Sequence, residues 1–498
     1  MKRCCLTFLS LLLATGSLQA EQAPSSSALD DIFLWLAGGI SSARVQRLGS
    51  AANETTGPAC RVTPSCVRAL QKAGANAALI QSLTARNAGR ASPQASSHKS
   101  SASAACGCAG PAAQIAALVH GKKLPAAEDK VHTLLHNDPQ NASLLFVLGT
   151  ILRGEERYDE ATDALTESLH RKPGFAETHT QLSYLFYRTD DSDLALAEAR
   201  TALSMDPANA EAYRYLGLAL YADGHYDAAL NAFDKSLERE PENADVYFDM
   251  GITQRDKGDL RRAAIAYRHA LTLRPDFWQA HSNLGVVLRD QGKLEDAVAE
   301  YRTAIRIQPD EASVRSNLGN TLCDLEDFDQ AITELKEVYR QRPDWEGGHN
   351  CLARAYMSKR DYPTAIRELR AAIAENPAGA AEHRVLGQAL LLSGQDQEAV
   401  AILRKAVTLN PASAQAHHYL GTALVNTQDL AGAEKEFREA LKLEPNAQNH
   451  YSLAACLMAL NQYEEALGEL EIASRLDPKE TLYRARMQEA ARMITSAK

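Results

Sequence analysis

Residues 278–311 read WQAHSNLGVVLRDQGKLEDAVAEYRTAIRIQPDE, and this stretch decides the fold. Leu284, Val287 and Leu288 recur at the spacing of one helix face, and Gly292 follows in a turn signal. A second apolar stripe then consists of Ala297, Val298, Tyr301, Ala304 and Ile305. Pro309 closes the stretch, because proline cannot continue a helix. The stretch therefore predicts two short helices joined by a turn.

The closing proline recurs along the chain in steps of 34 residues, except for a last step of 33. These prolines are Pro139, Pro173, Pro207, Pro241, Pro275, Pro309, Pro343, Pro377, Pro411, Pro445 and Pro478. A fixed period of this size predicts stacked helical hairpins that bury their apolar faces only against neighbours. Ten full units begin near Ala142, Ala176, Ala210, Ala244, Trp278, Ala312, Glu346, Ala380, Ala414 and Ala447.

Two positions of the unit are restricted to small residues. Position 20 is alanine in all ten units, and position 8 is glycine, alanine or serine. Glycine inside a helix costs about 1 kcal/mol relative to alanine, so a compensating contact is expected. We expect this contact to be a close approach of the first helix of each unit, helix A, to the second, helix B.

The pattern resembles the tetratricopeptide repeat family, whose 34-residue units share these leucine-glycine, alanine and proline positions. The resemblance covers roughly residues 111–480. It implies an all-α protein, a right-handed superhelical solenoid of about ten to eleven helix-turn-helix repeats. Position 4 departs from the family, which often has tryptophan there. Histidine takes this position in six units, and we interpret the rings as packing between helices rather than as acid–base groups: His179, His281, His349, His383, His417 and His450.

The first twenty residues have the features of a signal peptide. Lys2 and Arg3 precede a short apolar run, and Ala20 is a small residue at the expected cleavage point. The apolar run is too short to cross a bilayer. We therefore expect an exported chain, periplasmic or secreted, from a bacterial source.

Residues 28–88 predict a small separate helical domain. Its four expected helices cover 28–37, 44–48 with Ser41 or Ser42 as the cap, a segment from Thr63-Pro64 to Gly74, and 77–88 with Asn76 as the cap. The apolar content is thin for a domain of this size, which favours a staple. A disulfide between Cys60 and Cys66 would supply it in an exported protein, and two independent thiols are the alternative.

The remaining segments frame the repeats. Residues 89–110 are rich in Ser, Ala and Gly and predict a flexible linker. Within it, Cys106 and Cys108 are interpreted as a solvent-facing or oxidised pair, with an interchain disulfide as the alternative. Residues 111–141 predict a degenerate capping repeat, 142–480 the ten full repeats, and 481–498 a C-terminal capping helix.

The charge of the chain argues against nucleic acid as a partner. The net charge is -10, and residues 21–110 carry eight basic and four acidic residues. The solenoid is therefore strongly acidic, and an acidic surface repels phosphate backbones. Charge alone selects no protein partner.

Motifs for catalysis are absent from the sequence. It contains no G-x-x-x-x-G-K-[ST], H-E-x-x-H or G-x-S-x-G pattern. His132 and His136 have a spacing that can hold a metal on one helix face, but we interpret them as solvated or packed residues. Cys323, Cys351 and Cys456 are interpreted as single buried thiols. We expect no metal, no cofactor and no enzymatic activity.

The resemblance implies that positions 2, 5, 6, 9, 12 and 13 of helix A line a concave groove. The candidate binding residues there are Arg188, Arg214, Arg255, Asn283, Arg289, Asn317, Asn320, Asn350, Arg354, Arg384, Tyr419 and Tyr451. Asn283 and Asn317 look like the inner asparagine ladder of O-linked N-acetylglucosamine transferases, although no glycosyltransferase domain follows residue 480. Toward the C-terminus the groove positions become apolar, for example at Leu391 and Met458. An ordinary solvated face is the alternative interpretation.

These observations favour a non-enzymatic scaffold that binds a peptide or protein segment in the groove. Amide and guanidinium groups can hydrogen-bond a peptide backbone and its carboxylates, and the apolar region can bury side chains. The alternative is a structural or assembly protein of the cell envelope. An enzyme or metal protein is the third hypothesis and has the least support in the sequence.

Overall fold

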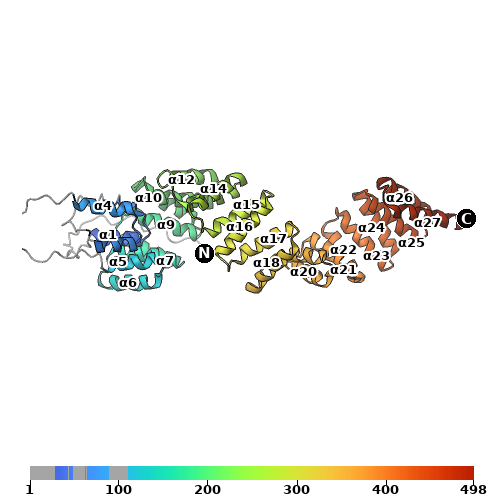
Figure 1. The fold of residues 1–498 in the computed structure, drawn as a ribbon, viewed down its shortest axis with the longest axis horizontal. Coiled ribbons are helices and arrows are strands. Elements are labelled where there is room, and N and C mark those ends of the chain that lie inside the picture. The colour runs from blue at the N-terminus through green and yellow to red at the C-terminus, as the bar shows by residue number, and fades with distance from the viewer. Residues whose placement is uncertain are drawn as a thin grey trace, which may run out of the picture. The chain divides into compact units, whose positions relative to one another are not determined.

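The structure, a computed structural model, describes residues 28–42, 44–46, 48, 62, 64–88 and 110–497. These residues form helices joined by short turns, and no strand occurs among them (Figure 1). They divide into two compact units, unit 1 up to Asp249 and unit 2 from Met250. The predicted signal peptide, residues 89–109 of the predicted linker, and Cys60, Cys106 and Cys108 lie outside the described residues.

Unit 1 begins with α1 (Ala28–Ala37), α3 (Pro64–Lys72), α4 (Ala77–Ala88), α5 (Pro111–His120) and α6 (Leu124–Asn137). Its repeat helices are α7 (Ala142–Gly154), α8 (Tyr158–Arg171), α9 (Ala176–Arg188), α10 (Ser192–Met205), α11 (Ala210–Ala222) and α12 (Tyr226–Leu237). Helix α13 (Ala244–Asp256) crosses the division between the units.

Unit 2 continues the alternation of A and B helices. Its helices are α14 (Leu260–Leu273), α15 (Trp278–Asp290), α16 (Leu294–Ile307), α17 (Ala312–Asp324), α18 (Phe328–Gln341), α19 (His349–Ser358), α20 (Tyr362–Glu375), α21 (Ala380–Leu392), α22 (Asp396–Leu409), α23 (Ala414–Asn426), α24 (Leu430–Leu443), α25 (Ala447–Ala459), α26 (Tyr463–Leu476) and α27 (Thr481–Ala497). The all-α solenoid of paired helices is confirmed. None of the helices in the described part of the chain is long and apolar enough to span a bilayer.

The turn inside each repeat contains a residue with left-handed backbone. Gly292, in the turn predicted from the sequence, has φ 75°. Other repeats place a non-glycine residue at the same position, such as Glu326 at φ 61° and Asn461 at φ 62°. The next residue's amide donates to a carbonyl near the end of helix A, as in Lys293 N to Leu288 O at 2.9 Å. This bond satisfies a carbonyl that the helix end leaves without a partner.

The seam between helices A and B is as close as the small residues predict. A Cβ added at Gly285 of α15 would lie 2.6 Å from Cε1 of Tyr301 in α16, well inside contact distance. At position 20, Ala297 is fully buried, and the alanines of the other nine repeats are equally buried. Glycine therefore lets an aromatic or leucine side chain of helix B lie directly against the backbone of helix A.

The N-terminal helices differ from the expectation of a separate domain. The predicted spans 28–37 and 77–88 are confirmed, and Asn76 caps α4 by accepting from Leu79 N at 2.9 Å. However, α1 packs on α5 and α7, and one apolar cluster extends from Ile32 to Leu185. The physical reason is the thin core foreseen from the sequence, which these helices complete by packing on the first repeats rather than alone.

The two ends of the repeat array follow the sequence closely. Helices α5 and α6 occupy the predicted degenerate repeat, and α27 packs on α26 as a C-terminal capping helix. Within the predicted apolar stripe of α27, Tyr483 and Ala490 are buried. Leu482 and Met493 are exposed instead, because only one side of this last helix has a neighbour in the stack.

One repeat departs from the regular pattern. Its helix A was expected to begin at Glu346, but α19 begins at His349, after Gly347 and Gly348, which both have φ 93°. Beside this irregularity, Cys323 of α17 and Cys351 of α19 form a disulfide, with their Cα atoms 5.8 Å apart. The prediction of single thiols was therefore wrong for these two residues. Cys456 remains a free, buried thiol.

Candidate binding surface on the first helices of the repeats

The A helices form the inner side of each unit. Neighbouring A helices contact one another, as α7 and α9 do in unit 1 and α21 and α23 do in unit 2. Neighbouring B helices of the described repeats make marginal contact at most. A stack whose A helices lie closer together curves with these helices inside. The predicted groove positions lie on these helices.

The N-terminal helices cover the inner face of the first repeats. Gly38, directly after α1, lies so close to Phe146 of α7 that an added Cβ would clash with its ring. Oγ of Ser143 donates to the carboxylate of Asp31 at 3.3 Å. The ring of Trp35 lies 6.5 Å from that of Phe175, at the start of α9. Figure 1 shows α1, α5 and α7 packed together at this end of unit 1.

An ion pair extends this cover to the next repeat. Nε of Arg44 lies 2.7 Å from Oε1 of Glu177, and both side chains are mostly buried. The same guanidinium also pairs with Asp206, at the end of α10. Ser41 donates to Glu240 at 2.8 Å, one repeat further along. The contacts of Arg44 and Ser41 thus follow the loop edge of consecutive repeats.

This cover is a permanent part of unit 1. Ile32, Phe33, Leu34 and Trp35 are all buried. Burying a large apolar side chain contributes roughly 1.5–3 kcal/mol, so displacing α1 would cost on the order of 10 kcal/mol. A binding partner cannot easily supply that energy. The cover therefore disfavours binding of a partner at the inner face of the first repeats.

Further along unit 1, the inner face forms a network of arginine and tyrosine side chains. Arg153 donates to Gln181 Oε1 at 2.5 Å and to the hydroxyl of Tyr215 at 3.1 Å. That hydroxyl in turn donates to Glu211 at 2.6 Å, and burial raises the pKa of Tyr215 above its usual range. The guanidinium of Arg153 also lies 5.2 Å from the centre of the Tyr184 ring. These polar groups satisfy one another.

The predicted binding residues of unit 1 are engaged in this network. Arg188 donates to the Tyr184 hydroxyl at 3.0 Å and stacks over the Tyr158 ring. Arg214 contacts Asp249 at 2.6 Å. Burial raises the pKa of Asp249, and the neighbouring guanidinium of Arg214 opposes this shift. Both arginines lie on A helices, and each already has an internal partner.

In unit 2, one carboxylate is shared by two predicted arginines. Asp324 lies 3.3 Å from Nε of Arg289 and 3.5 Å from Nη1 of Arg354. Arg354 also donates to the backbone carbonyl of Cys323 at 3.3 Å, so the disulfide adjoins this cluster. The three side chains together carry one net positive charge. We call Arg289, Asp324 and Arg354 the Asp324 cluster.

Three predicted asparagines in unit 2 have no such partners. Asn283, Asn317 and Asn320 are half-buried, and their side-chain amides make no hydrogen bond to the described part of the chain. Asn283 and Asn317 occupy the same position in consecutive repeats. Their amides can therefore donate to and accept from a ligand backbone without breaking an internal contact.

The other predicted residues of unit 2 have mixed surroundings. Arg255 is paired with the adjacent Asp256, and Asn350 donates to Glu382 at 3.0 Å. Arg384 lines a small cavity between α21, α22 and α23. Tyr419 lies edge-on to the His418 ring, and burial lowers the pKa of that histidine. Tyr451 lies against Tyr483 of the capping helix, with ring centres 5.2 Å apart.

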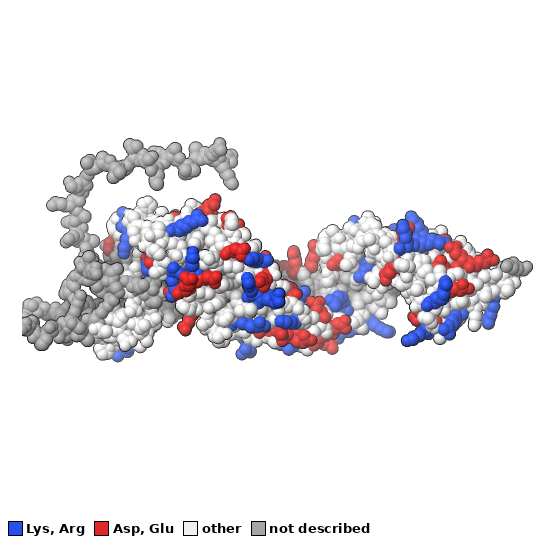
Figure 2. Space-filling model, turned by 90° about the horizontal axis from the view of Figure 1, so that it is seen from above, with Lys and Arg blue, Asp and Glu red and all other residues white. Residues whose placement is uncertain are grey.

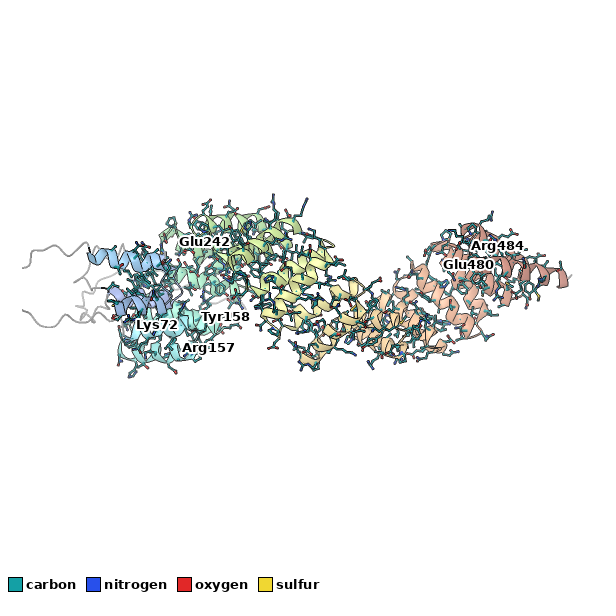
Figure 3. All side chains as sticks on the ribbon, viewed as in Figure 1. Lys72, Arg157, Tyr158, Glu242, Glu480 and Arg484 are labelled. Atoms are coloured by element: carbon teal, nitrogen blue, oxygen red, sulfur yellow. A yellow bond between two sulfur atoms is a disulfide. The ribbon has the colours of Figure 1, made fainter. Side chains whose placement is uncertain are left out.

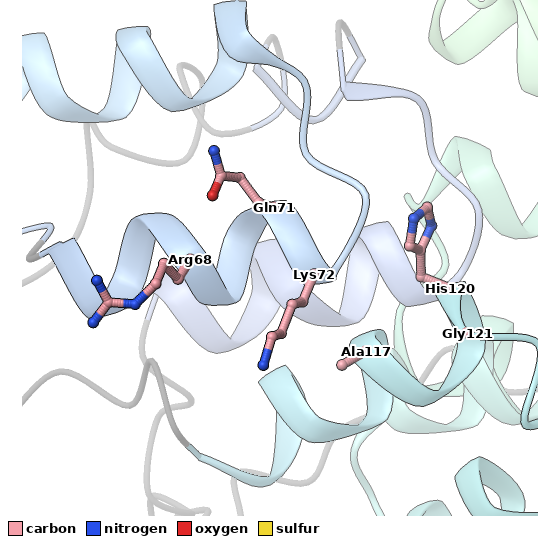
Figure 4. Close-up of a pocket in the computed structure, with 6 residues that line it drawn as sticks. All are labelled: Arg68, Gln71, Lys72, Ala117, His120 and Gly121. Carbon is pink, nitrogen blue, oxygen red and sulfur yellow. The ribbon is translucent and has the colours of Figure 1, made fainter.

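A second surface, outside the repeats, is a shallow cavity of about 520 Å³ between α3 and α5 (Figure 4). Arg68, Lys72 and His120 bring basic groups to its rim. All three side chains are exposed, so they are well solvated and form no enclosed polar site. We assign no ligand to this cavity.

Other chemistry has little support in the described residues. No group of three or more His, Cys, Asp or Glu side chains able to hold a metal occurs among them. His132 is exposed and lies 3.5 Å from Glu128. Figure 2 shows acidic and basic side chains next to one another on the face that it draws. That face of the described repeats carries no large area of a single charge.

Sequence reasoning missed the partners of the position-4 histidines. They do lie between helices A and B, but most of them contact a glutamate of helix B in the same repeat. His179, for example, contacts Glu198 at 2.5 Å. The signal was present in the sequence, because the glutamate follows the histidine by 19 residues in each such repeat.

Comparison with known families agrees with the repeat pattern. A tetratricopeptide repeat model matches residues 115–174, 180–245, 217–273, 248–312 and 352–414, and a second such model matches 288–355. A model of subunit 3 of the anaphase-promoting complex, or cyclosome, matches residues 392–473. A search of curated proteins found no match.

Several solved structures resemble parts of the chain. MamA from Desulfovibrio magneticus RS-1 is 24% identical, with a TM-score of 0.32 over 34% of this chain and 95% of that one. PilF from Pseudomonas aeruginosa is 20% identical, with a TM-score of 0.38 over 42% of this chain and 94% of that one. A chain of the APC/C hetero-tetramer Cut9-Hcn1 is 16% identical, with a TM-score of 0.38 over 77% of this chain and 84% of that one.

The family assignment rests on the repeats themselves. The matched residues together span more than half of the chain. They coincide with helix pairs whose buried alanine and glycine seams were expected from the 34-residue period. This protein therefore belongs to the tetratricopeptide repeat family, whose helical solenoids serve as scaffolds for protein interaction.

Proposed function

We propose that this protein is an exported, non-enzymatic scaffold that binds an extended segment of another protein on the inner face of α15, α17, α19, α21 and α23. The family supports the scaffold role in general. The specific surface is favoured because the inner face of the first repeats in unit 1 is covered by the chain's own N-terminal helices. Unit 2 keeps inner-face polar groups that have no internal partner.

The observation that carries the proposal is the set of free amides at Asn283, Asn317 and Asn320. An extended peptide presents alternating N–H and C=O groups, and a carboxamide can both donate and accept. Half-buried amides have lost part of their water and gain by bonding a ligand. Such contacts hold the backbone of a segment and leave its side chains to determine specificity.

The Asp324 cluster suggests an acidic side chain in the bound segment. Two guanidiniums face one carboxylate, so the cluster can accept a second negative group. Arginine binds carboxylates in a two-pronged geometry, which favours Asp or Glu on the partner. The partly buried apolar side chains of α21 and α23, such as Leu391 and Val425, then offer contacts to apolar residues of the same segment.

Two features support export. The N-terminal twenty residues have the composition of a signal peptide. Cys66 is disulfide-bonded, and Cys323 is bonded to Cys351. Disulfides persist in oxidising compartments and are rare in the cytosol.

If the protein is exported and processed as proposed, mass spectrometry of the mature chain identifies an N-terminal peptide that begins at Glu21. An N-terminus at Met1 would contradict this part of the proposal.

Site-specific photo-crosslinking in cells tests the binding surface. A photoreactive residue at Asn317 should capture one protein through a defined segment. The matched control is the exposed Lys405 on the B helix α22, where the segment should not be captured. Asn283→Ala should weaken capture at Asn317. Equal labelling at Asn317 and Lys405, or capture unaffected by both Asn283→Ala and Arg354→Glu, would exclude this inner face as the binding surface.

A further inference from the structure

Two positions of the repeat vary together along this single chain. They are position 4 on helix A and position 23 on helix B. A cationic or imidazole side chain at position 4 accompanies glutamate at position 23 in six repeats: His179–Glu198, His281–Glu300, Arg315–Glu334, His349–Glu368, His417–Glu436 and His450–Glu469. Where position 4 is Leu145, Tyr213 or Tyr247, position 23 is alanine. His383, paired with Ile402, is the exception.

The structure brings each of these pairs together. In all five histidine pairs the Nδ1 atom contacts the glutamate Oε2, at 2.5 to 2.8 Å. Arg315 contacts Glu334 with Nη1 at 2.6 Å. The same slot therefore accepts histidine or a permanently charged arginine with the same glutamate contact.

The slot also contains a second acceptor. Nε2 of His281 lies 3.1 Å from the carbonyl of Pro275, and Nε2 of His417 lies 3.1 Å from the carbonyl of Pro411. Arg315 donates to the equivalent carbonyl of Pro309 at 3.2 Å. Each of these prolines follows the C-cap residue of the preceding B helix. The helix dipole favours a positive charge at this end of a helix.

Two other contacts repeat the same preference for a cation. Arg484, at the start of α27 (Figure 3), donates to the carbonyl of Pro478 at 2.7 Å. In the repeat that has Tyr213 at position 4, Arg239 donates to the carbonyl of Pro207 at 3.1 Å. The proline carbonyl thus receives a positively charged donor even where the histidine is missing.

A neutral imidazole cannot donate to both acceptors at His281 or at His417. It carries one N–H, so with Nδ1 donating to glutamate its Nε2 would direct a lone pair at the proline carbonyl. Only the imidazolium donates from both nitrogens. At His349 the second neighbour is a carboxylate, because Nε2 lies 3.6 Å from Glu375. This arrangement also favours the charged ring.

We propose that the slot is a cation site that histidine makes pH-sensitive, so that imidazolium–glutamate pairs join helices A and B below neutral pH and weaken above it. The charged or titratable groups facing His281 are Glu300 and Arg306 of α16. Those facing His349 are Glu368 and Glu375 of α20 and the stacked Tyr339 of α18. His417 faces Glu436 of α24.

The direction of the effect follows from proton linkage. Burial opposes the charge on His281, but its hydrogen bonds to Glu300 and to the Pro275 carbonyl prevail and raise its pKa above the usual value. A histidine whose pKa is raised in the folded state contributes stability that is complete below the unfolded pKa of about 6.5. This stability is lost as pH rises through the folded pKa.

His383 provides an internal control. It occupies the same position, but Ile402 replaces the glutamate. Its Nδ1 lies 2.8 Å from the carbonyl of Gly379, a contact that a neutral ring makes equally well. The repeat that contains His383 should therefore respond less to pH than the repeat that contains His281.

Hydrogen exchange of the full chain tests this proposal. Protection of α15 and α16, corrected for the intrinsic exchange rate, should fall between about pH 5.5 and pH 8.5 by a larger factor than that of α21 and α22. His281→Arg should remove this loss, since arginine stays charged, as Arg315 does in its own repeat. With His281→Gln, α15 and α16 should have low protection at both pH values. His383→Gln should leave the pH response of α15 and α16 unchanged.

The proposal is overturned if His281→Arg retains the wild-type loss of protection, or if His281→Gln retains the wild-type pH response. A second measurement does not depend on how well the variants fold. In the wild-type chain with ¹⁵N-labelled histidine, both ring nitrogens of His281 should be protonated at about pH 6.5, and its titration midpoint should lie above the ordinary histidine value of about 6.5. A midpoint at or below that ordinary value would equally refute the proposal.

Discussion

The inner faces of the two units carry similar side chains. The units differ in whether these side chains already contact other parts of the same chain. In unit 1, α1 covers Phe146, and Arg44 pairs with Glu177. Arg214 beyond this cover has Asp249 as an internal partner. In unit 2, the amides of Asn283 and Asn317 have no partner within the described chain. The repeat determines where a side chain points, whereas long-range contacts determine whether it is available to a ligand.

The largest expected effect comes from removing the cover of unit 1. Phe33 is fully buried in α1, and Phe33→Ala should lower the stability of unit 1 by about 3–5 kcal/mol through loss of apolar burial and the cavity that remains. Hydrogen exchange of α7 should increase sharply, whereas that of α23 should not change.

The control for this variant is Leu392→Ala in unit 2, because Leu392 is 51% exposed. Substitution of an exposed residue should change stability by less than about 0.5 kcal/mol. If Phe33→Ala leaves the exchange of α7 unchanged, α1 does not close the inner face of the first repeats, and the contrast between the units fails.

The disulfide of unit 2 should have the next largest effect. Reducing the bond between Cys323 and Cys351, which are 28 positions apart, should destabilise α17 to α19 by about 2–4 kcal/mol by freeing the unfolded chain. Because Arg354 donates to the Cys323 carbonyl, the Asp324 cluster should also become less ordered. Because Cys456 is buried, thiol labelling of the unfolded chain without reductant should detect Cys456 but neither Cys323 nor Cys351. Modification of all three cysteines without reductant would contradict this prediction.

The regular part of the molecule could be predicted from the sequence because its determinants are local. The prolines, glycines and alanines recur every 34 residues, and helix A begins at the predicted residue in nine of the ten repeats. In the remaining repeat, Gly347 and Gly348 delay the helix to His349. Glycine adopts left-handed backbone at no steric cost, so the repeat pattern yields to local chemistry there.

The candidate site was less predictable because its contacts are distant in sequence. Arg44 and Glu177 are 133 residues apart, and no periodic signal connects them. The repeat placed Arg289, Asp324 and Arg354 on the A helices of three consecutive units, but it did not indicate that both arginines contact this one carboxylate. By contrast, the histidine–glutamate pairs have a constant spacing of 19 residues, so comparison of the chain's own repeats can detect them.

A pair of glycine substitutions tests the close packing of helices A and B in unit 2, where the inner face is open. Gly285→Ala should destabilise unit 2 by about 1–3 kcal/mol, because the new Cβ would lie 2.6 Å from the Tyr301 ring. Gly468→Ala, in the helix α26, meets no atom within 4 Å and should stabilise by about 1 kcal/mol. Urea unfolding should show shifts of opposite sign. A destabilising shift for Gly468→Ala would contradict this explanation. The cost of Gly285→Ala could then not be attributed to the clash with Tyr301 alone.

The smallest effect on stability should accompany a large effect on binding. Asn317 makes no side-chain hydrogen bond within the described chain, so Asn317→Ala should change the unfolding free energy by less than about 0.5 kcal/mol. If the open inner face of unit 2 binds a partner backbone, the same change should weaken binding of the crosslinked segment several-fold, by the value of one or two hydrogen bonds. Arg214→Ala in unit 1 should show the reverse, since it removes a guanidinium that contacts the buried Asp249 and costs about 1.5–3 kcal/mol. Calorimetry of the segment with both variants compares the two faces directly. Equal loss of binding in both variants would mean that internally paired and unpaired side chains contribute alike, and the distinction between the units would have no functional meaning.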